Sequence, residues 1–217
     1  YVVSPGGAGN AVTVGDCVSA DLRMSVEAQA GTVRIVGTSH ALIVGDLSST
    51  LSHALKIENS DVTIYGNCTS TGGNGAANGV WLTSGKCSVY GNCAAVAALP
   101  AKTDGGHLIL HGDAHSERRW GVGTINGGRI DMYGTASCDQ RAAVYVGPGG
   151  EVHLHGRAVA PNALEGAVLL TPTGALTLYG GAYLDTQSTY NMNVEGGVAA
   201  TVRNYGAAAN KPTRPAV

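Results

Sequence analysis

One short sequence pattern recurs along most of the chain. It reads apolar residue, any residue, apolar residue, Tyr or His, Gly, and it starts at residues 62, 87, 108, 130, 152, 176 and, in a degraded form, 202. Successive starting points are 21 to 26 residues apart. Repetition at this spacing is typical of solenoids, in which each repeat forms one coil stacked on the next. The repeat therefore constrains the fold more than local propensity does.

The apolar positions of the pattern alternate with other residues, as in a half-buried β-strand. Val62 and Ile64 are thus predicted to point inward, and Thr63 and Tyr65 outward. The glycine that follows permits a bend that a side chain would resist. Two positions later comes a small residue, which stacked coils favour because counterparts lie only about 4.8 Å apart. This small column is Cys68, Cys93, Ala114, Ala136, Ala158 and Ala182.

A second stretch in most repeats combines a short strand with a turn rich in Gly, Pro, Asn or Ser. Examples are HALKIENSD (53–61), GVWLTSGK (79–86) and AAVYVGPGGE (142–151). Each repeat has room for two or three strands with their corners, but it is too short for two helices. We therefore predict an all-β fold, a single-stranded right-handed parallel β-helix, over residues 31–206.

Both ends depart from the pattern. Residues 1–30 are predicted to be an N-terminal cap or entry segment, in which SADLRMSVEAQA (19–30) fits a short amphipathic helix. Residues 207–217 are rich in Ala and contain two prolines, which favours an extended C-terminal linker or tail.

Composition excludes several classes of function. The 13 basic and 15 acidic residues give no basic excess, so we expect no nucleic-acid partner. No apolar run approaches the length of a membrane-spanning helix, so we expect no membrane insertion. The five cysteines show no CxxC spacing, which favours free thiols in the core over a zinc site or a full disulfide framework. A disulfide between Cys68 and Cys93 on adjacent coils is the alternative.

Coils of this length with outward aromatic residues, together with the exit segment ANKPTRP (209–215), resemble the right-handed parallel β-helix domains of bacteriophage tailspikes and related tail receptor-binding proteins. The resemblance covers about residues 30–217. It implies a homotrimer in the virion tail, outside the cell, that contacts other tail proteins and binds bacterial surface polysaccharide. Pectate lyases and bacterial autotransporter adhesins share this architecture, so a polysaccharide depolymerase and a bacterial surface adhesin are the alternatives.

Cleavage of a glycan by the usual route needs two carboxyl groups on one sugar. Asp131 is the best outward-facing candidate, with Asp113, Glu117 and Asp139 in loops. Asp131 lies one coil from His153 in a predicted outward column, so the two form a candidate acid/base pair or an ordinary ion pair. We favour a chain without enzymatic activity and take Asp131, His153 and Glu117 as the catalytic candidates if it has one.

The segment SERRWGVG (116–123) is the candidate glycan-binding site. Trp120 would stack on the face of a pyranose, and Arg118, Arg119 and Glu117 would hydrogen-bond hydroxyl groups or a sugar carboxylate. Trp and Arg are also enriched at protein interfaces, so a contact between protomers is the alternative. Trp81 lies within a predicted strand, where packing against a neighbouring coil or chain is the expected use.

The histidines at 153 and 155 share one face of a strand, an arrangement that metal sites use. His155 and His111, however, take the position that Tyr occupies in the other repeats, so we predict no metal and no cofactor. The column is predicted to be a ladder of stacked rings, with a trimer interface or a carbohydrate track as its other uses. Its members are Tyr65, Tyr90, His111, Tyr133, His155, Tyr179 and Tyr205.

Overall fold

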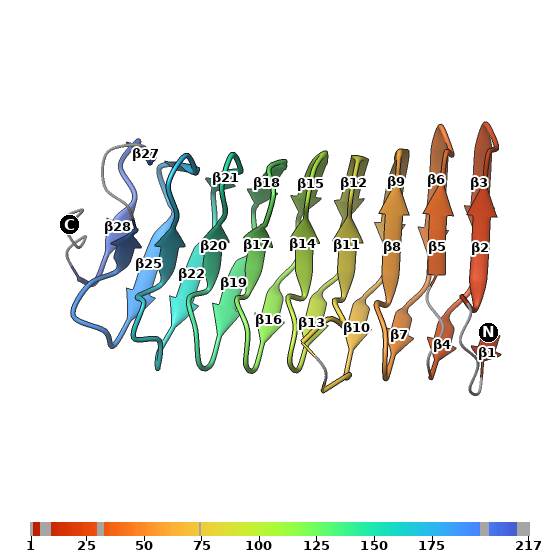
Figure 1. Ribbon diagram of the computed structural model, residues 1–217, viewed down its shortest axis with the longest axis horizontal. Coiled ribbons are helices and arrows are strands. Elements are labelled where there is room, and N and C mark those ends of the chain that lie inside the picture. The colour runs from red at the N-terminus through yellow and green to blue at the C-terminus, as the bar shows by residue number, and fades with distance from the viewer. Residues whose placement is uncertain (1, 5–9, 30–32, 74, 196–199, 212–217) are drawn as a thin grey trace.

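The computed structural model describes residues 2–4, 10–29, 33–73, 75–195 and 200–211. These residues form a parallel β-solenoid of about nine coils, stacked along one axis as Figure 1 shows. The described residues contain 28 strands, β1 to β28, and no helix. None of the described segments therefore has the length and apolarity of a membrane-spanning helix. The predicted all-β solenoid is confirmed.

Three parallel sheets make the walls of the solenoid, and each coil adds one strand to each sheet. Sheet A contains β1 (Val2–Ser4), β4 (Val26–Ala28), β7 (Leu47–Ser49), β10 (Cys68–Ser70), β13 (Cys93–Ala95), β16 (Ala114–Ser116), β19 (Thr135–Cys138), β22 (Arg157–Ala160), β25 (Tyr183–Thr186) and β28 (Ala208–Ala209). Sheet B contains β2 (Val12–Gly15), β5 (Val33–Val36), β8 (Leu55–Glu58), β11 (Val80–Leu82), β14 (Ala101–Thr103), β17 (Val122–Thr124), β20 (Val144–Val146), β23 (Val168–Leu170) and β26 (Met192–Val194). Sheet C contains β3 (Ser19–Leu22), β6 (His40–Val44), β9 (Ser60–Tyr65), β12 (Gly85–Val89), β15 (His107–Leu110), β18 (Arg129–Met132), β21 (Glu151–Leu154), β24 (Ala175–Leu178) and β27 (Thr201–Asn204).

The recurring sequence pattern forms sheet C, and its apolar positions fill the core. Val62 lies opposite Cys87 on the next coil, and the same column continues with Leu108 and Ile130. These side chains are buried, as predicted from the alternation. Full burial of an aliphatic side chain stabilises a fold by about 1.5–3 kcal/mol. Because every coil adds members to such columns, the core is continuous along the solenoid.

The predicted small column is confirmed from Cys68 as far as Ala158, with Cys68 opposite Cys93. Its last member is wrong, because Leu184 and not Ala182 lies opposite Ala158. The longer turn that contains Gly180 and Gly181 shifts the register of the chain there.

All five cysteines are free thiols, as predicted. A hydrogen bond to Cys93, together with burial, raises the pKa of the Cys68 thiol well above its ordinary value. Burial also raises the pKa of Cys87. These thiols therefore act as small core side chains in their protonated form.

The helix predicted within residues 19–30 is wrong. Ser19–Leu22 and Val26–Ala28 are strands that pair in register with the next coil. Ala20 and Leu22 pack against the core on alternate positions, so period-two burial outweighs the weak helical pattern. Strands β2 to β4 already form a coil, and the solenoid thus begins within the segment that was expected to be an entry region.

At the other end of the chain, β28 pairs with β25. Residues 207–211 thus still lie against the last coil, within the segment predicted to be a linker or tail. Residues 212–217 of that predicted tail lie outside the described residues.

A ladder of Asp and Asn side chains marks the corner after the glycine of the pattern. Asp46 Oδ1 accepts a hydrogen bond from the backbone N–H of Asn67 (2.7 Å), and Asn67 Oδ1 accepts one from Asn92 (2.9 Å). Asn92 does the same for Asp113 (2.9 Å), and Asp113 for Thr135 (2.7 Å). Each corner is thereby tied to the next. Asp113 is thus a structural member of this ladder.

The Tyr and His column is a stacked ladder, as predicted. Ring centroids of successive members from Tyr65 to Tyr179 are 4.1–5.3 Å apart, and their planes differ by at most 13°. The last ring, Tyr205, is tilted by 33° at 5.9 Å from Tyr179. Four of the tyrosines are 46–62% exposed, so the ladder lies on the outer surface.

Replacing Tyr133 tests how much the ladder stabilises the solenoid. Tyr133→Ala removes two stacked contacts, with His111 and His155, each of which is worth about 0.5–1.5 kcal/mol. We expect the free energy of unfolding in urea to fall by about 1–3 kcal/mol. Tyr133→Phe keeps the ring and is the matched control. Equal stability of the two variants would show that stacking contributes nothing.

Candidate functional site

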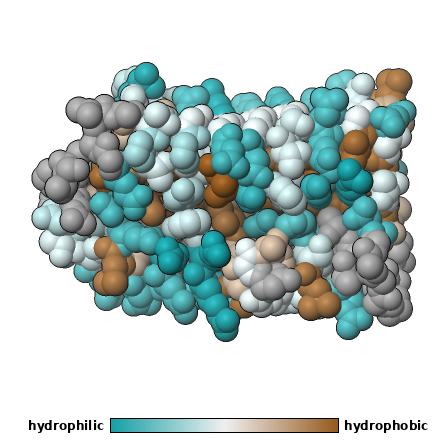
Figure 2. Space-filling view, in the orientation of Figure 1, coloured by the Kyte–Doolittle hydropathy of each residue, from teal (hydrophilic) through white to brown (hydrophobic). Residues whose placement is uncertain are grey.

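A pocket of about 390 Å³ lies on the face of sheet B. Figure 2 shows this face as largely polar, with a small apolar patch near the middle coils. The pocket is lined by His53, Gly75, Ala76, Asn78, Trp81, Leu99, Lys102, Arg119, Trp120, Ile125 and Tyr145. The lining thus combines three aromatic rings (Trp81, Trp120 and Tyr145) with two cations (Lys102 and Arg119) and with apolar side chains such as that of Leu99.

One outward column of sheet B supplies three of the pocket-lining residues and lacks a side chain at one coil. The column runs Lys56, Trp81, Lys102, Gly123, Tyr145 through the central residues of five strands. A Cβ at Gly123 would lie only 2.5 Å from Leu99 Cδ2, so the leucine side chain covers this gap. The φ of Gly123 is not in the left-handed region, so the backbone conformation does not require a glycine here. What the glycine provides is room for the Leu99 side chain.

The rim of the pocket comes from the connections that lead from sheet A to sheet B. Residues 71–79 supply Gly75, Ala76 and Asn78, and residues 96–100 supply Leu99. Residues 117–121 supply Arg119 and Trp120. The first of these connections is the longest, and it therefore gives the pocket a wall that the neighbouring coils do not have.

Trp81 is held on three sides. Lys56 and Lys102, on the preceding and following coils, place their Nζ atoms 4.6 and 4.7 Å from the centroid of the indole. The indole Nε1–H donates to Asp104 Oδ2 at 2.7 Å, and Lys102 forms an ion pair with the same oxygen at 3.1 Å. Cation–π contacts of this kind contribute about 0.5–1 kcal/mol each at partly exposed sites. The ring is thus fixed before any ligand arrives.

Trp120 is positioned from the other end of the pocket. Its ring stacks on Tyr145 with centroids 4.0 Å apart and planes 17° apart. Its Nε1–H donates to Glu165 Oε2 at 3.3 Å, and Arg141 holds that carboxylate with an ion pair of 2.8 Å. A platform held in this way loses little conformational entropy when a ligand binds.

His53 adds a neutral imidazole to the pocket. Burial, and then the charges of Lys102 and Lys56, lower the pKa of His53 to about 4. The backbone N–H of Asn78 donates to His53 Nδ1 at 3.1 Å. This hydrogen bond places the single ring proton of the neutral form on Nε2. His53 is therefore a hydrogen-bond donor toward a ligand at neutral pH.

The residues of the predicted glycan site lie partly within this pocket and partly outside it. Trp120 and Arg119 line the pocket, whereas Glu117 and Arg118 are exposed and do not line it. Trp81 was expected only to pack, and it contributes to the same pocket. Sequence reasoning did not single out His53, Lys102 or Tyr145, which also line the pocket.

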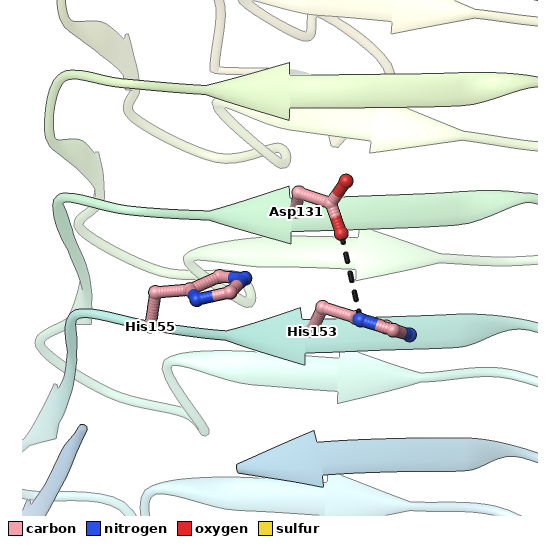
Figure 3. A group of neighbouring side chains, drawn as sticks. All are labelled: Asp131, His153 and His155. Atoms are coloured by element: carbon pink, nitrogen blue, oxygen red, sulfur yellow. Dashed lines mark ion pairs between the residues drawn. The ribbon is translucent and has the colours of Figure 1, made fainter. Parts of the chain in front are cut away.

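A second polar group lies on the outer face of sheet C, around the predicted pair Asp131 and His153. The two residues face each other across β18 and β21, as predicted, and Figure 3 shows His153 turned toward Asp131. The distance from His153 Nδ1 to Asp131 Oδ1 is 3.7 Å. Both residues point outward, yet they are only 8% and 5% exposed because neighbouring side chains cover them.

Each member of the pair has closer partners than the other member. Asp131 Oδ1 lies 2.9 Å from Arg129 Nη2, and Asp131 Oδ2 lies 2.5 Å from His107 Nε2. His153 contacts Glu151 Oε1 at 2.6 Å and the hydroxyl of Tyr179 at 3.0 Å. The group is therefore a hydrogen-bonded ion network.

The electrostatics of Asp131 argue against a role as general acid. Burial alone would raise its pKa, but the hydrogen bonds from His107 and Arg129 outweigh burial and hold the pKa below its ordinary value. A general acid must carry a proton near the working pH. Of the loop acids, Asp113 belongs to the corner ladder, Asp139 faces His115 at 3.8 Å, and Glu117 is exposed.

Asp131, His153 and His155 also form a potential metal-ligand set, since one ligand atom of each lies within 4.8 Å of the others. Figure 3 shows the three side chains together. The guanidinium of Arg129, however, lies 2.9 Å from the same carboxylate. A positive charge at this distance opposes a second cation, so the geometry gives the set no advantage as a metal centre.

Fold and pocket together define a parallel β-solenoid with a preformed aromatic and basic pocket on one face. Comparisons of the chain with protein-family models, curated proteins and solved structures find no match.

Replacing Asp131 by Asn tests whether the sheet C network is structural. Asp131→Asn leaves Arg129 and His107 without their carboxylate, and we expect a loss of about 1–3 kcal/mol in unfolding free energy at pH 7. The difference in unfolding free energy between the wild type and this variant should shrink as the pH falls below about 4. A carboxyl group whose pKa is lowered in the folded state stabilises the fold only while it is ionised, and Asp131 becomes protonated as the pH falls through its folded-state pKa. Asp139→Asn, at the exposed pair with His115, is the control with little expected effect. A stable Asp131→Asn variant would contradict the structural role.

Proposed function

We propose that the chain is a host-recognition module that binds bacterial surface polysaccharide through the pocket on sheet B. We further propose that the chain forms a homotrimer in a phage tail, of the tailspike or tail-fibre type, because its solenoid architecture resembles that of those proteins. The observation that carries the proposal is the pocket itself, which is lined by Trp81 at one end and by the stacked Trp120 and Tyr145 at the other.

The shape of the pocket supports a chain-like ligand. Trp81 and Tyr145 lie three coil steps apart along the solenoid axis, which corresponds to about 14 Å at the spacing of parallel strands. An extended oligosaccharide lies naturally along such a surface. Aromatic rings with adjacent hydrogen-bond donors are the groups that contact the apolar face and the polar edge of a sugar ring.

The Tyr and His ladder is less suited to hold a glycan. Its rings stack face to face, so they present edges to solvent, whereas the sheet B pocket places cationic and hydrogen-bonding side chains beside its rings. We propose that the half-exposed ladder contacts neighbouring protomers of the trimer.

The proposal is for binding without cleavage. Both Asp131 and His153 are committed to other partners, and Glu117 lies outside the pocket. A depolymerase on this chain would need a pair of carboxyl groups on one sugar. The carboxylates nearest the pocket, Asp104 and Glu165, instead hold the two indole rings in place.

Binding to purified capsular and lipopolysaccharide glycans tests the proposal. Gly123→Leu would displace the side chain of Leu99, which lines the pocket, and we expect it to weaken binding at least about tenfold, the equivalent of 1.4 kcal/mol. Ala94→Leu places the same side chain at an outward strand centre on sheet A and should bind like the wild type. A reducing-end assay should reveal no new ends.

Two results would contradict the proposal. The first is the absence of binding to every surface glycan tested, and the second is undiminished binding by Gly123→Leu. Circular dichroism of both variants checks that the solenoid is retained.

A further inference from the structure

The polar groups of the pocket indicate the chemical class of its ligand. We propose that the pocket selects acidic polysaccharides, and that Arg119 and Lys102 hold the carboxylate of a uronic-acid-type sugar. This inference rests on the proposed glycan-binding function and specifies its ligand.

The charged side chains that line the pocket are cations. Lys102 and Arg119 line it, and the lining residues include neither Asp nor Glu. Lys56, on the coil before Trp81, also lies close to the indole, and its charge is shared with Glu58 through an ion pair of 3.1 Å. The chain as a whole carries a net charge of −2, so this local positive charge departs from the average of the protein.

The nearby carboxylates are occupied by the residues that they orient. Asp104 binds Trp81 and Lys102, and Glu165 binds Trp120 and Arg141. Within the described part of the chain, the Arg119 guanidinium forms no ion pair. Its charge is therefore available to a ligand, and the charge of Lys102 is shared with Asp104.

The arginine side chain is placed over the pocket by the fold. Arg119 Nη2 lies 3.2 Å from the position that a Cβ on residue 75 would occupy, so Gly75 leaves room for the guanidinium. The same guanidinium lies 5.8 Å from the centroid of the Trp120 ring. Contacts on both sides hold the guanidinium near the aromatic platform, which reduces the entropy cost of binding.

The acceptors of the lining are already used, which leaves mostly donors. Asn78 Oδ1 accepts from the backbone N–H of Leu99 at 3.2 Å, and His53 Nδ1 accepts from Asn78. Besides the Tyr145 hydroxyl, which can donate or accept, the polar groups left in the lining include the Arg119 guanidinium, the Lys102 ammonium and the His53 imidazole, which supply donors. A neutral sugar hydroxyl brings a donor that would find few acceptors here, whereas a carboxylate brings acceptors only.

A planar carboxylate fits this donor set better than a tetrahedral sulfate does. The guanidinium is a planar fork that binds a carboxylate through two parallel hydrogen bonds. The ammonium of Lys102 approaches from the column of sheet B and offers a further donor. The carboxylate of a uronic-acid sugar is attached directly to the pyranose ring that contacts Trp120, so one sugar unit engages both groups.

The experiment compares each ligand with its own neutral derivative. Oligomers of galacturonate, of mannuronate and of a glucuronate-containing polymer are titrated calorimetrically, each beside its carboxyl-reduced form, with dextran sulfate as the sulfated control. We expect at least one uronate to bind at least about tenfold more tightly than its reduced form, and more tightly than dextran sulfate.

Two variants locate the effect. Arg119→Gln should remove most of the preference for the acidic form while retaining binding to neutral sugar, and Arg118→Gln is the matched control. Arg118 is the adjacent arginine, exposed and outside the pocket lining. Its loss should leave the preference unchanged.

The outcomes separate this inference from the function on which it rests. Equal affinity for acidic and reduced glycans would overturn the acidic selectivity and leave glycan binding intact. Absence of binding to acidic, reduced and other surface glycans would overturn both. Tighter binding of dextran sulfate, or an equal effect of Arg118→Gln and Arg119→Gln, would show diffuse attraction by charge and would overturn the carboxylate site.

Discussion

Every feature of this protein depends on the hydrogen-bonded register between one coil and the next. Parallel pairing sets each residue about 4.8 Å from its counterpart, so the side chains form columns that run along the solenoid. Inward columns must fill a continuous core, and they are accordingly aliphatic or small. Corner columns satisfy the backbone of the next coil, as in the Asp and Asn ladder from Asp46 to Thr135. The outward columns need neither fill the core nor bond to the backbone of the next coil, so their residue types can vary from coil to coil.

Two outward columns illustrate this freedom in opposite ways. On sheet C, rings occupy every coil from Tyr65 to Tyr205, and they stack into a ladder. On sheet B the column changes from Trp81 and Lys102 to Gly123, where the Leu99 side chain occupies the space, and a pocket lies beside this column between Trp81 and Trp120. Fixed neighbours on either side of a gap make a preorganised site without any mobile element.

The sequence predicts the columns of sheet C well, because large apolar residues alternate there and a glycine follows each time. It predicts the pocket less well. Strand β14 (Ala101–Thr103) has no large apolar residue to mark it, so Lys102 could not be aligned with Trp81. The helix predicted near Leu22 failed because short segments take the conformation that the neighbouring coil imposes. Arg119 and Trp120 were identified from residue type alone, whereas Arg118 and Glu117 could be excluded only from the three-dimensional arrangement.

We propose that the solenoid is a rigid support and that the pocket between Trp81 and Trp120 is the place where it meets a glycan. A crystal structure of the protein with an acidic oligosaccharide tests this most directly. We predict a sugar ring in the space between Trp81 and Trp120, with its carboxylate against Arg119. A bound sugar along the Tyr and His ladder of sheet C, or a register in which Gly123 does not lie between Lys102 and Tyr145, would contradict the account.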